Sequence, residues 1–162
     1  MRFNVSHLVK APIGTQGVLR LDSGAISLDG ELDLHYLRGE INLTRSTDCL
    51  LAKGQLDTTL DSECVRCLVS FPLSLTIQID GLAFALPHIS SQDNQYCISQ
   101  DGWINVDLAL REQVFLDIPQ YTLCRPDCHG LCSMCGQDLN NGSCNCKESK
   151  IDPCLAALHN LL

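Results

Sequence analysis

Six cysteines lie close together in the stretch CRPDCHGLCSMCGQDLNNGSCNC, which runs from Cys124 to Cys146. Their spacing is C-x3-C-x3-C-x2-C-x8-C-x-C, and an earlier pair, Cys64 and Cys67, lies in the sequence CVRC. Thiolates at such short intervals are typical ligands of tetrahedral zinc, which takes four Cys or His residues, usually in two close pairs. The spacing therefore predicts that this chain binds metal.

The cysteines divide naturally into two sets of four. The first set lies wholly in the tail and contains Cys132, Cys135, Cys144 and Cys146. The second set combines the earlier pair with the start of the tail and contains Cys64, Cys67, Cys124 and Cys128. In each C-x-x-C pair, the two-residue gap lets one tight turn aim both thiolates at one point. We expect two structural Zn²⁺ ions, with a single Zn²⁺ held by four of the six tail cysteines as the alternative.

Other uses of the sulfur are open at this stage. His129 could replace a cysteine, although its place beside Gly130 in a turn favours a surface position. An iron–sulfur cluster also takes four thiolates, but the spacing does not match the usual ferredoxin runs. A thioredoxin-type redox pair needs C-x-x-C beside a parallel βαβ unit, whereas CVRC lies between two β-patterned stretches.

The predicted metal sites have a structural purpose. Between residues 120 and 148 the chain has few large apolar side chains, too few to offset the entropy of ordering this segment. A structural zinc site supplies about 10–16 kcal/mol, which becomes folding free energy. With four protein ligands no position is open for water, so each site would be structural and not catalytic. The other three cysteines, Cys49, Cys97 and Cys154, are expected to be free.

Charge and cysteine usage limit the compartment and the partners. The chain has 162 residues, a net charge of −8 and 11 cysteines. It has no signal-peptide core and no apolar run of about 18 residues, so we expect a cytoplasmic protein without membrane association. Two four-thiolate zinc sites would take the net charge to about −12. Such an acidic protein favours a basic partner over general RNA binding.

The first two thirds of the sequence are patterned as β-strands. In FPLSLTIQID, residues 71–80, apolar and polar residues alternate, and ELDLHY, residues 31–36, alternates likewise. INLT and QLDTTLDS continue this pattern less regularly, and a polar loop is expected at residues 87–102.

A helix is predicted at about residues 105–118, followed by the tail. Val106, Leu110, Val114 and Ile118 fall four residues apart on one helical face. Asn105 or Asp107 could cap this helix and Pro119 would end it. A short terminal helix is expected in IDPCLAALHNLL, with Asp152 as its cap and Pro153 at its first helical position.

These elements predict an α+β fold. We expect an antiparallel β-meander or partly open barrel packed by the amphipathic helix, with a C-terminal cysteine-rich zinc-knuckle segment and a short terminal helix. The sheet and helix would occupy residues 1–119, and the metal-binding tail with its helix residues 120–162, the two packed as one compact unit. Common catalytic and nucleotide-binding motifs are absent from the sequence, so we expect no enzyme.

Several motifs together resemble the bacterial and plastid YceD family, the large ribosomal RNA subunit accumulation proteins. The resemblance is carried by CVRCL, by LREQVFLDIPQYTLCRPDCHGLCSMCGQDLNNGSCNC and by IDPCLAAL, and it covers roughly residues 60–160. Cys154 stands where the family has a basic residue, and Ser133 where it often has proline; neither departure removes a predicted ligand. The resemblance implies a role in accumulation of large-subunit rRNA, hence in ribosome biogenesis, with no known catalysis.

Acidity and resemblance together suggest a non-enzymatic ribosome-biogenesis factor with structural zinc. It would bind a ribosomal protein or a large-subunit assembly intermediate, and no small-molecule substrate is expected. One alternative is direct rRNA binding through the zinc tail, with local contacts from cationic side chains. These are Arg66, Arg125, Lys147 and Lys150. The other alternative is a thiol redox or Fe–S carrying protein.

Overall fold

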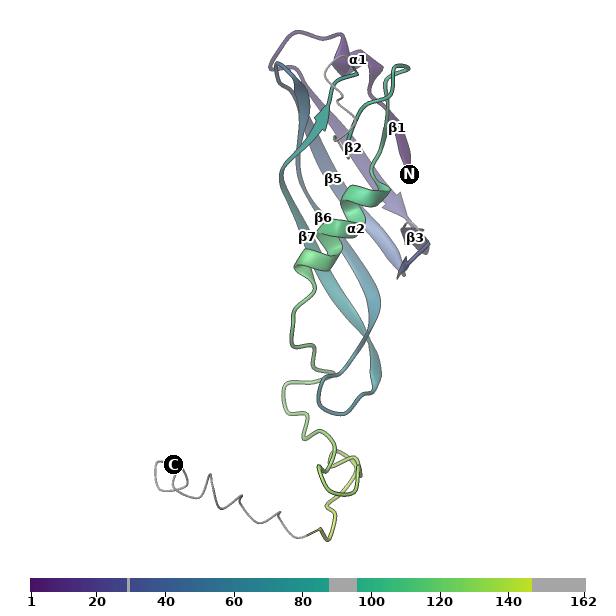
Figure 1. Ribbon diagram of the computed structural model, residues 1–162, viewed down its shortest axis with the longest axis vertical. Helices are drawn as coiled ribbons and strands as arrows, with labels where there is room; N and C mark the ends of the chain where they lie inside the picture. Colours follow the sequence, from purple (N-terminus) through teal and green to yellow (C-terminus); the bar gives the residue numbers. More distant parts are fainter. Residues whose placement is uncertain (29, 88–95, 147–162) are drawn as a thin grey trace, which may run out of the picture. The chain divides into compact units, whose positions relative to one another are not determined.

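The computed structural model describes residues 1–28, 30–87 and 96–146 (Figure 1). The chain divides into two compact units. The sheet unit contains residues 1–62 and 72–120, and the cysteine unit contains residues 63–71 and the chain from residue 121 onward. Within the described residues, no helix has the length and apolar character that crossing a membrane requires. The predicted terminal helix after Asp152 lies outside the described residues.

A four-stranded sheet in the order β2-β5-β6-β7 is the main element of the sheet unit. Its strands are β2 (Gln16–Ser23), β5 (Tyr36–Arg45), β6 (Cys49–Glu63) and β7 (Ser70–Ala85). Strand β5 pairs antiparallel with both β2 and β6. Side-chain contacts show that β7 runs antiparallel to β6. Asp57 accepts a hydrogen bond from Thr76 at 2.8 Å, and Lys53, which comes earlier in β6, pairs at 2.8 Å with Asp80, which comes later in β7. The antiparallel sheet is confirmed, and closure into a partly open barrel stays a prediction.

Two small ribbons accompany this sheet. Strand β1 (Arg2–Asn4) pairs with β8 (Trp103–Asn105), and β3 (Ile26–Leu28) pairs with β4 (Leu32–Leu34). A short helix, α1 (Ser6–Val9), follows β1. The alternating residues 31–36 belong to two strands, because β4 ends at Leu34 and β5 begins at Tyr36. The chain changes partner at His35, whose backbone N–H donates to the Thr59 carbonyl at 2.8 Å, and the alternation continues unbroken across this change.

Helix α2 (Asp107–Asp117) is the predicted amphipathic helix. Val106, Leu110 and Val114 are buried, as the fourfold spacing predicted. Val106 occupies the N-cap position, and no side chain caps the helix there. The two residues expected to cap it, Asn105 and Asp107, lie one position before and one position after Val106. The Asn105 Oδ1 nevertheless accepts the Asp107 N–H at 3.2 Å. The helix ends at an extended Ile118, because the residue before a proline disfavours helical backbone.

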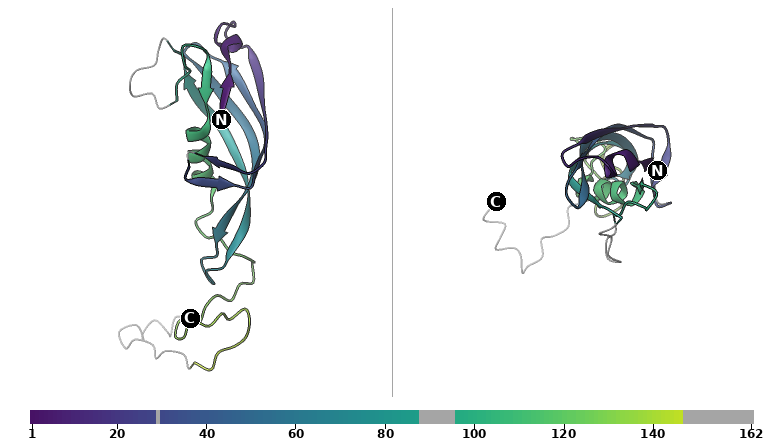
Figure 2. Two further views of the ribbon diagram at one scale, coloured as in Figure 1. Left: turned by 90° about the vertical axis from the view of Figure 1, so that its right-hand side faces the viewer. Right: turned by 90° about the horizontal axis from the view of Figure 1, so that it is seen from above.

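Helix α2 lies against one face of the sheet (Figure 2), and buried side chains of both form the hydrophobic core. Ile41 from β5, Ile79 from β7 and Leu110 from α2 line the same small apolar void. Phe84 of β7 is only 1% exposed and packs edge-on against Tyr96, with ring centroids 6.2 Å apart. Burial in this core and hydrogen bonding to Glu112 raise the pKa of Tyr96 to about 12. The core therefore packs Tyr96, in the segment that leads into β8, against the sheet.

The close approach of β5 and β6 depends on glycine. Gly54 lies opposite Ile41, and a Cβ at this position would be 2.2 Å from the carbonyl oxygen of Glu40. Replacing it by alanine is expected to lower the free energy of unfolding by about 1–3 kcal/mol, because the backbone itself must shift. Urea denaturation followed by tryptophan fluorescence measures this loss.

Gly24 provides the control for that substitution. A Cβ at Gly24 would have no atom within 4 Å. Gly24→Ala should therefore leave stability unchanged, or raise it by up to about 1 kcal/mol through the unfolded state. Equal midpoints for Gly54→Ala and Gly24→Ala would contradict the close packing of β5 on β6.

Candidate metal centres

The cysteine unit brings the predicted residues together in two clusters. The hairpin cluster is named after the connection between β6 and β7, the hairpin tip, which carries its first two cysteines. It consists of Cys64, Cys67, Cys124 and Cys128. The tail cluster consists of Cys132, Cys135, Cys144 and Cys146. Within each cluster all four sulfur atoms lie within 4.8 Å of one another. The grouping is the one expected from the spacing, and in the part of the chain that the structure describes no histidine joins either cluster.

The sulfur separations fit one tetrahedral ion. The Sγ atoms of Cys64 and Cys128 are 3.8 Å apart, and those of Cys67 and Cys124 are 3.6 Å apart. Four sulfurs at about 2.3 Å from a central Zn²⁺ would be about 3.8 Å from one another. A disulfide would require about 2.05 Å, and all the described cysteines are free thiols. The hairpin cluster therefore has the ligand type and the size for a single metal ion.

The two C-x-x-C turns are built in the same way. The Leu68 N–H donates to the Cys64 carbonyl at 2.9 Å, and the Gly136 N–H donates to the Cys132 carbonyl at 2.9 Å. The residue after each second cysteine has left-handed backbone, with φ of 58° at Leu68 and 73° at Gly136. Glycine adopts this conformation freely, whereas leucine does so at an energetic cost. The hairpin cluster thus holds an exposed leucine in a conformation that few side chains adopt.

The segment after α2 returns to the hairpin tip through backbone hydrogen bonds. The Val65 N–H donates to the Thr122 carbonyl at 2.9 Å, and the Thr122 hydroxyl donates to the Glu63 carbonyl at 2.7 Å. Arg66 completes this connection, because its Nη1 donates to the Cys128 carbonyl at 2.8 Å and its own carbonyl accepts the Leu131 N–H at 3.0 Å. Residues far apart in sequence are thereby held at one point.

Solvent reaches the two clusters to different extents. In the hairpin cluster three cysteines are buried and Cys124 is half-buried, with apolar cover from Phe71, Leu123 and Leu131. In the tail cluster Cys135 and Cys146 are exposed. The hairpin cluster is therefore the better shielded of the two.

In each cluster the surroundings lower the pKa of one cysteine thiol and raise the pKa of another. Burial raises the pKa of Cys64, but backbone N–H donors outweigh burial and bring it down to about 6. Burial and the neighbouring thiols raise the pKa of Cys124 to about 12. In the tail cluster, backbone N–H groups lower the pKa of Cys132 to about 6, while contact with the Cys135 thiol raises the pKa of Cys146 to about 12. A bound cation would remove this conflict, because it favours the thiolate at all four positions.

Asn140 connects the hairpin cluster to the loop of the tail cluster. Its Nδ2 lies 3.5 Å from the Cys128 sulfur and donates to Asp138 Oδ1 at 2.7 Å. Its Oδ1 accepts from Arg125 Nη2 at 2.8 Å and from the His129 N–H at 2.9 Å. The sequence prediction missed this role, although the asparagine stands within the quoted motif. Asn140 orients the Cys128 thiol and its neighbours, in the way that groups just outside a metal site orient its ligands.

Asn140→Ala is expected to weaken metal binding at the hairpin cluster by about 10- to 100-fold, because the Cys128 sulfur loses its amide donor. Competition with a chromophoric chelator measures this change. Asn141→Ala is the matched control, since the Asn141 side chain donates to Asp138 Oδ2 at 2.8 Å and not to a cysteine. Equal affinities in the two variants would contradict the role of Asn140.

Cys49 and Cys97, two of the three cysteines expected to be free, belong to neither cluster. Cys49 is half-buried in β6 and Cys97 is exposed, while Cys154 lies outside the described residues. Arg125 is occupied within the cysteine unit, and its Nε lies 3.7 Å from Asp127 Oδ1. Lys147 and Lys150 lie outside the described residues.

An antiparallel sheet with two four-thiol clusters defines a β-sheet protein equipped to hold metal ions. The chain belongs to the YceD family. The family model, described as "Large ribosomal RNA subunit accumulation protein YceD", matches residues 52–162 and so includes all eight cysteines of the two clusters. The resemblance carried by the cysteine motifs is confirmed.

Relatives are found in mycobacteria and in a plant. An uncharacterised protein of Mycobacterium leprae is 31% identical over 72% of this chain and 54% of its own length. An uncharacterised protein of Mycobacterium tuberculosis is 26% identical over 99% of this chain and 74% of its own length. The chloroplastic large ribosomal RNA subunit accumulation protein YCED homolog 1 of Zea mays is 33% identical over 39% of this chain and 22% of its own length. The chain thus spans about half the length of the M. leprae relative. No solved structure matches significantly.

Proposed function

We propose that this chain is a non-enzymatic ribosome-biogenesis factor of the cytoplasm, needed for accumulation of large-subunit rRNA. The observation that carries the proposal is the family match, which spans both cysteine clusters and bears the name of large-subunit rRNA accumulation. The maize relative, which carries the same name, supports it. The chain would act by binding a ribosomal protein or a large-subunit assembly intermediate.

The two clusters would each hold a structural Zn²⁺. Four thiolates suit zinc, and a site closed by protein ligands leaves no position for a reacting water. A multi-iron cluster places its thiolates on different metal atoms, which needs wider separations than the 4.8 Å that contains all four sulfurs here. Zinc would supply the folding free energy that the small apolar cover of Phe71, Leu123 and Leu131 does not.

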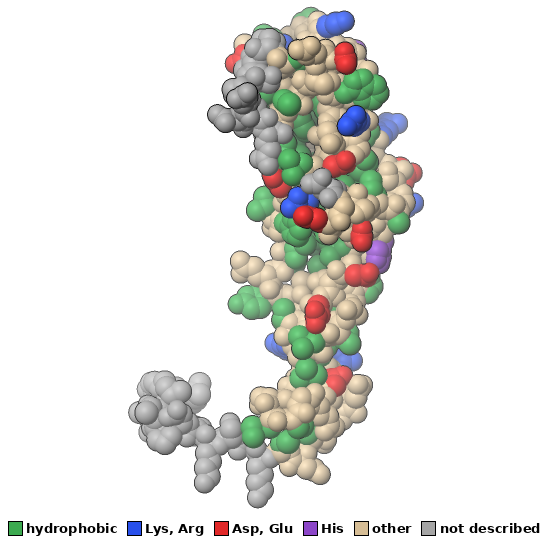
Figure 3. All heavy atoms as spheres, turned by 45° about the vertical axis from the view of Figure 1, so that its right-hand side comes forward, with side chains coloured by type: hydrophobic (Ala, Val, Ile, Leu, Met, Phe, Trp, Pro, Cys, Tyr) green, Lys and Arg blue, Asp and Glu red, His purple; other side chains and the backbone are tan. Residues whose placement is uncertain are grey.

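Charge favours a protein partner over diffuse binding to RNA. The net charge is −8, and on the face drawn in Figure 3 acidic and basic side chains are interspersed without a basic patch. In the cysteine unit, Arg66 donates to the Cys128 carbonyl and Arg125 to Asn140, so both guanidinium groups have partners within the unit. These engagements support a stabilising role for the two arginines, and they weaken the case for RNA binding through the tail.

Deletion of the gene tests the proposal. The ratio of large-subunit to small-subunit rRNA should fall in the deletion strain and recover when the wild-type chain is restored. A variant with Cys64→Ser and Cys132→Ser should fail to restore it, whereas Cys49→Ser, which changes a half-buried cysteine outside both clusters, should succeed. An unchanged rRNA ratio in the deletion strain would reject the proposal.

A further inference from the structure

The β1–β8 ribbon has one apolar face and one polar face. In its register Arg2 lies opposite Asn105, and Asn4 lies opposite Trp103. Phe3 and Ile104 alternate with these residues and turn toward the core, where Ile104 is fully buried. Because side chains alternate across a strand, the Arg2–Asn105 pair and the Asn4–Trp103 pair share the outer face. The ribbon therefore presents a cation, an aromatic ring and two amides together.

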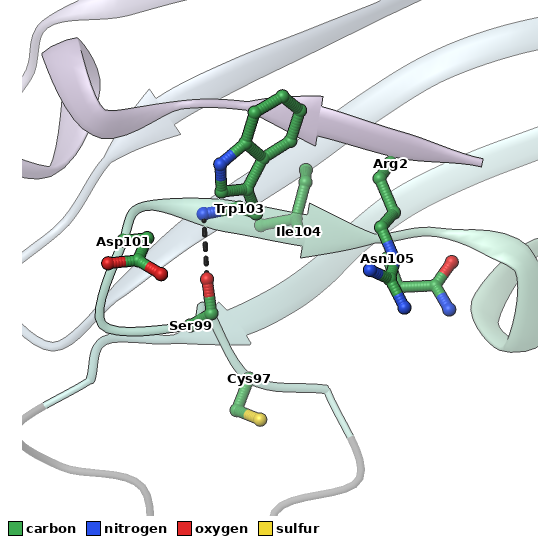
Figure 4. A pocket seen from close by; sticks show the side chains of 7 residues that line it. All are labelled: Arg2, Cys97, Ser99, Asp101, Trp103, Ile104 and Asn105. Carbon is green, nitrogen blue, oxygen red and sulfur yellow. Dashed lines mark hydrogen bonds between the residues drawn. The ribbon is translucent and has the colours of Figure 1, made fainter.

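A pocket of about 650 Å³ adjoins this ribbon (Figure 4). Its lining includes Arg2 and Asn105 at one end and Ser99 and Asp101 at the other, with Trp103 between them. The Ser99 Oγ accepts the Trp103 backbone N–H at 3.0 Å, which fixes the turn beneath the indole. The pocket thus has a cationic end and an acceptor end on the two sides of an aromatic residue.

Arg2 differs from the other arginines in having no partner among the described residues. The other six donate to carboxylates, to an amide or to backbone carbonyls; they are Arg20, Arg38, Arg45, Arg66, Arg111 and Arg125. An exposed guanidinium with all its donors available is suited to a phosphate or carboxylate, which it can bind through two parallel hydrogen bonds. This arginine lies in the same pocket as the only tryptophan of the chain.

Trp103 is 44% exposed, although tryptophan is highly buried on average. Its backbone is fixed by the pairing of β8 with β1, so the ring is carried by an ordered element. An exposed aromatic ring on a rigid strand is the usual platform for stacking an unpaired nucleobase.

We propose that this pocket binds one nucleotide of single-stranded RNA. The proposal rests on the role in large-subunit rRNA accumulation, and it gives that role a point of contact in the sheet unit. Trp103 stacks on the base, and Arg2 binds the adjacent phosphate. The Asn105 Nδ2 donates beside Arg2, since its Oδ1 already accepts the Asp107 N–H. Asp101 and Ser99 accept hydrogen bonds from the ribose hydroxyl or the base amino group at the opposite end.

One contact of this kind is compatible with an acidic chain. It neutralises a single phosphate, so the logarithm of the association constant should fall with the logarithm of salt concentration with a slope of about −0.7. Diffuse binding by a basic surface would give a slope several times steeper. The low salt dependence separates a local nucleotide pocket from general electrostatic attraction.

Fluorescence of Trp103 reports directly on the pocket, because the chain has no other tryptophan. The full chain should be titrated with oligouridylate and oligoadenylate, and fluorescein-labelled copies should be followed by anisotropy. We expect quenching by both. Trp103→Ala should weaken binding by about 5- to 150-fold, as loss of one stacked base does, and Trp103→Phe should retain part of the affinity. Arg2→Ala should weaken binding and bring the salt slope close to zero.

Matched controls come from the same unit. Phe115→Ala removes an aromatic ring that is 51% exposed on α2, and Lys10→Ala removes an exposed cation after α1. Both variants should bind the oligonucleotides like the wild-type chain. Circular dichroism shows whether each variant is folded.

Two results would overturn the proposal: no quenching by RNA, or equal losses in the Phe115 and Trp103 variants. If oligoglutamate quenched the fluorescence where RNA did not, the pocket would be assigned to an acidic protein segment. These results are distinguishable from failure of the proposed function, which is decided by the rRNA ratio in the deletion strain. RNA binding in vitro with an unchanged rRNA ratio would retain the pocket and reject the cellular role.

Discussion

Removal of the proposed Zn²⁺ ions from both clusters is expected to unfold the cysteine unit and to leave the sheet unit folded. The cysteine unit has only a small apolar core around Phe71, Leu123 and Leu131, whereas the sheet unit has the large core between α2 and the sheet. Structural Zn²⁺ contributes about 10–16 kcal/mol in small domains, so its loss exceeds the stability of any unit of this size. Hydrogen exchange read by mass spectrometry measures the result.

The expected pattern has two parts. Backbone amides of residues 121–146 should exchange rapidly after chelation, because their hydrogen bonds depend on the two clusters. Fluorescence of Trp103 in the sheet unit should keep its native spectrum. Cys49→Ser, which changes a cysteine outside both clusters, should behave like the wild-type chain before and after chelation. Retained protection of residues 121–146 in fully metal-free protein would contradict the structural role of the metal.

Phe84→Ala is expected to lower the free energy of unfolding of the sheet unit by about 3–5 kcal/mol. The ring is 1% exposed, packs edge-on against Tyr96 and lines the void beneath α2. Its removal loses buried apolar surface and leaves a cavity that this antiparallel sheet can close only in part. Urea denaturation followed by Trp103 fluorescence gives the loss directly.

The control for Phe84 is the same substitution on the surface of the same unit. Phe115 is 51% exposed on α2, and its ring lies 5.8 Å from the Arg111 guanidinium carbon. Phe115→Ala should cost no more than about 1 kcal/mol, because it removes one exposed cation–π contact and little buried area. If the two variants lost equal stability, the assignment of the core to this face of the sheet would be wrong.

Each C-x-x-C pair could be predicted from the sequence because its geometry is local. A two-residue gap places both sulfurs of Cys64 and Cys67, or of Cys132 and Cys135, on one turn whatever the rest of the fold does. The same holds for α2, where the fourfold spacing of Val106, Leu110 and Val114 marks the buried face. Both patterns repeat within a few residues, so neighbouring positions determine them.

Other features depend on partners that lie far away in the sequence. Strand β1 is three residues long and pairs with β8, about a hundred residues later, so nothing near Arg2 indicates the ribbon. The division at His35 reflects a change of pairing partner and leaves no trace in the alternation of ELDLHY. The role of Asn140 arises only when its amide reaches the Cys128 sulfur. Each is fixed by tertiary contacts and not by local preference.

The hairpin cluster also imposes an order in time on the newly made chain. Cys64 and Cys128 are 64 residues apart, so at about 5–20 residues per second the second thiol is synthesised roughly 3 to 13 seconds after the first. During that interval Cys64 and Cys67 are a two-thiol site without its other half. The tail cluster, by contrast, is completed within one continuous stretch. The cysteine unit therefore matures last during translation, and the pair at residues 64 and 67 must stay reduced until then.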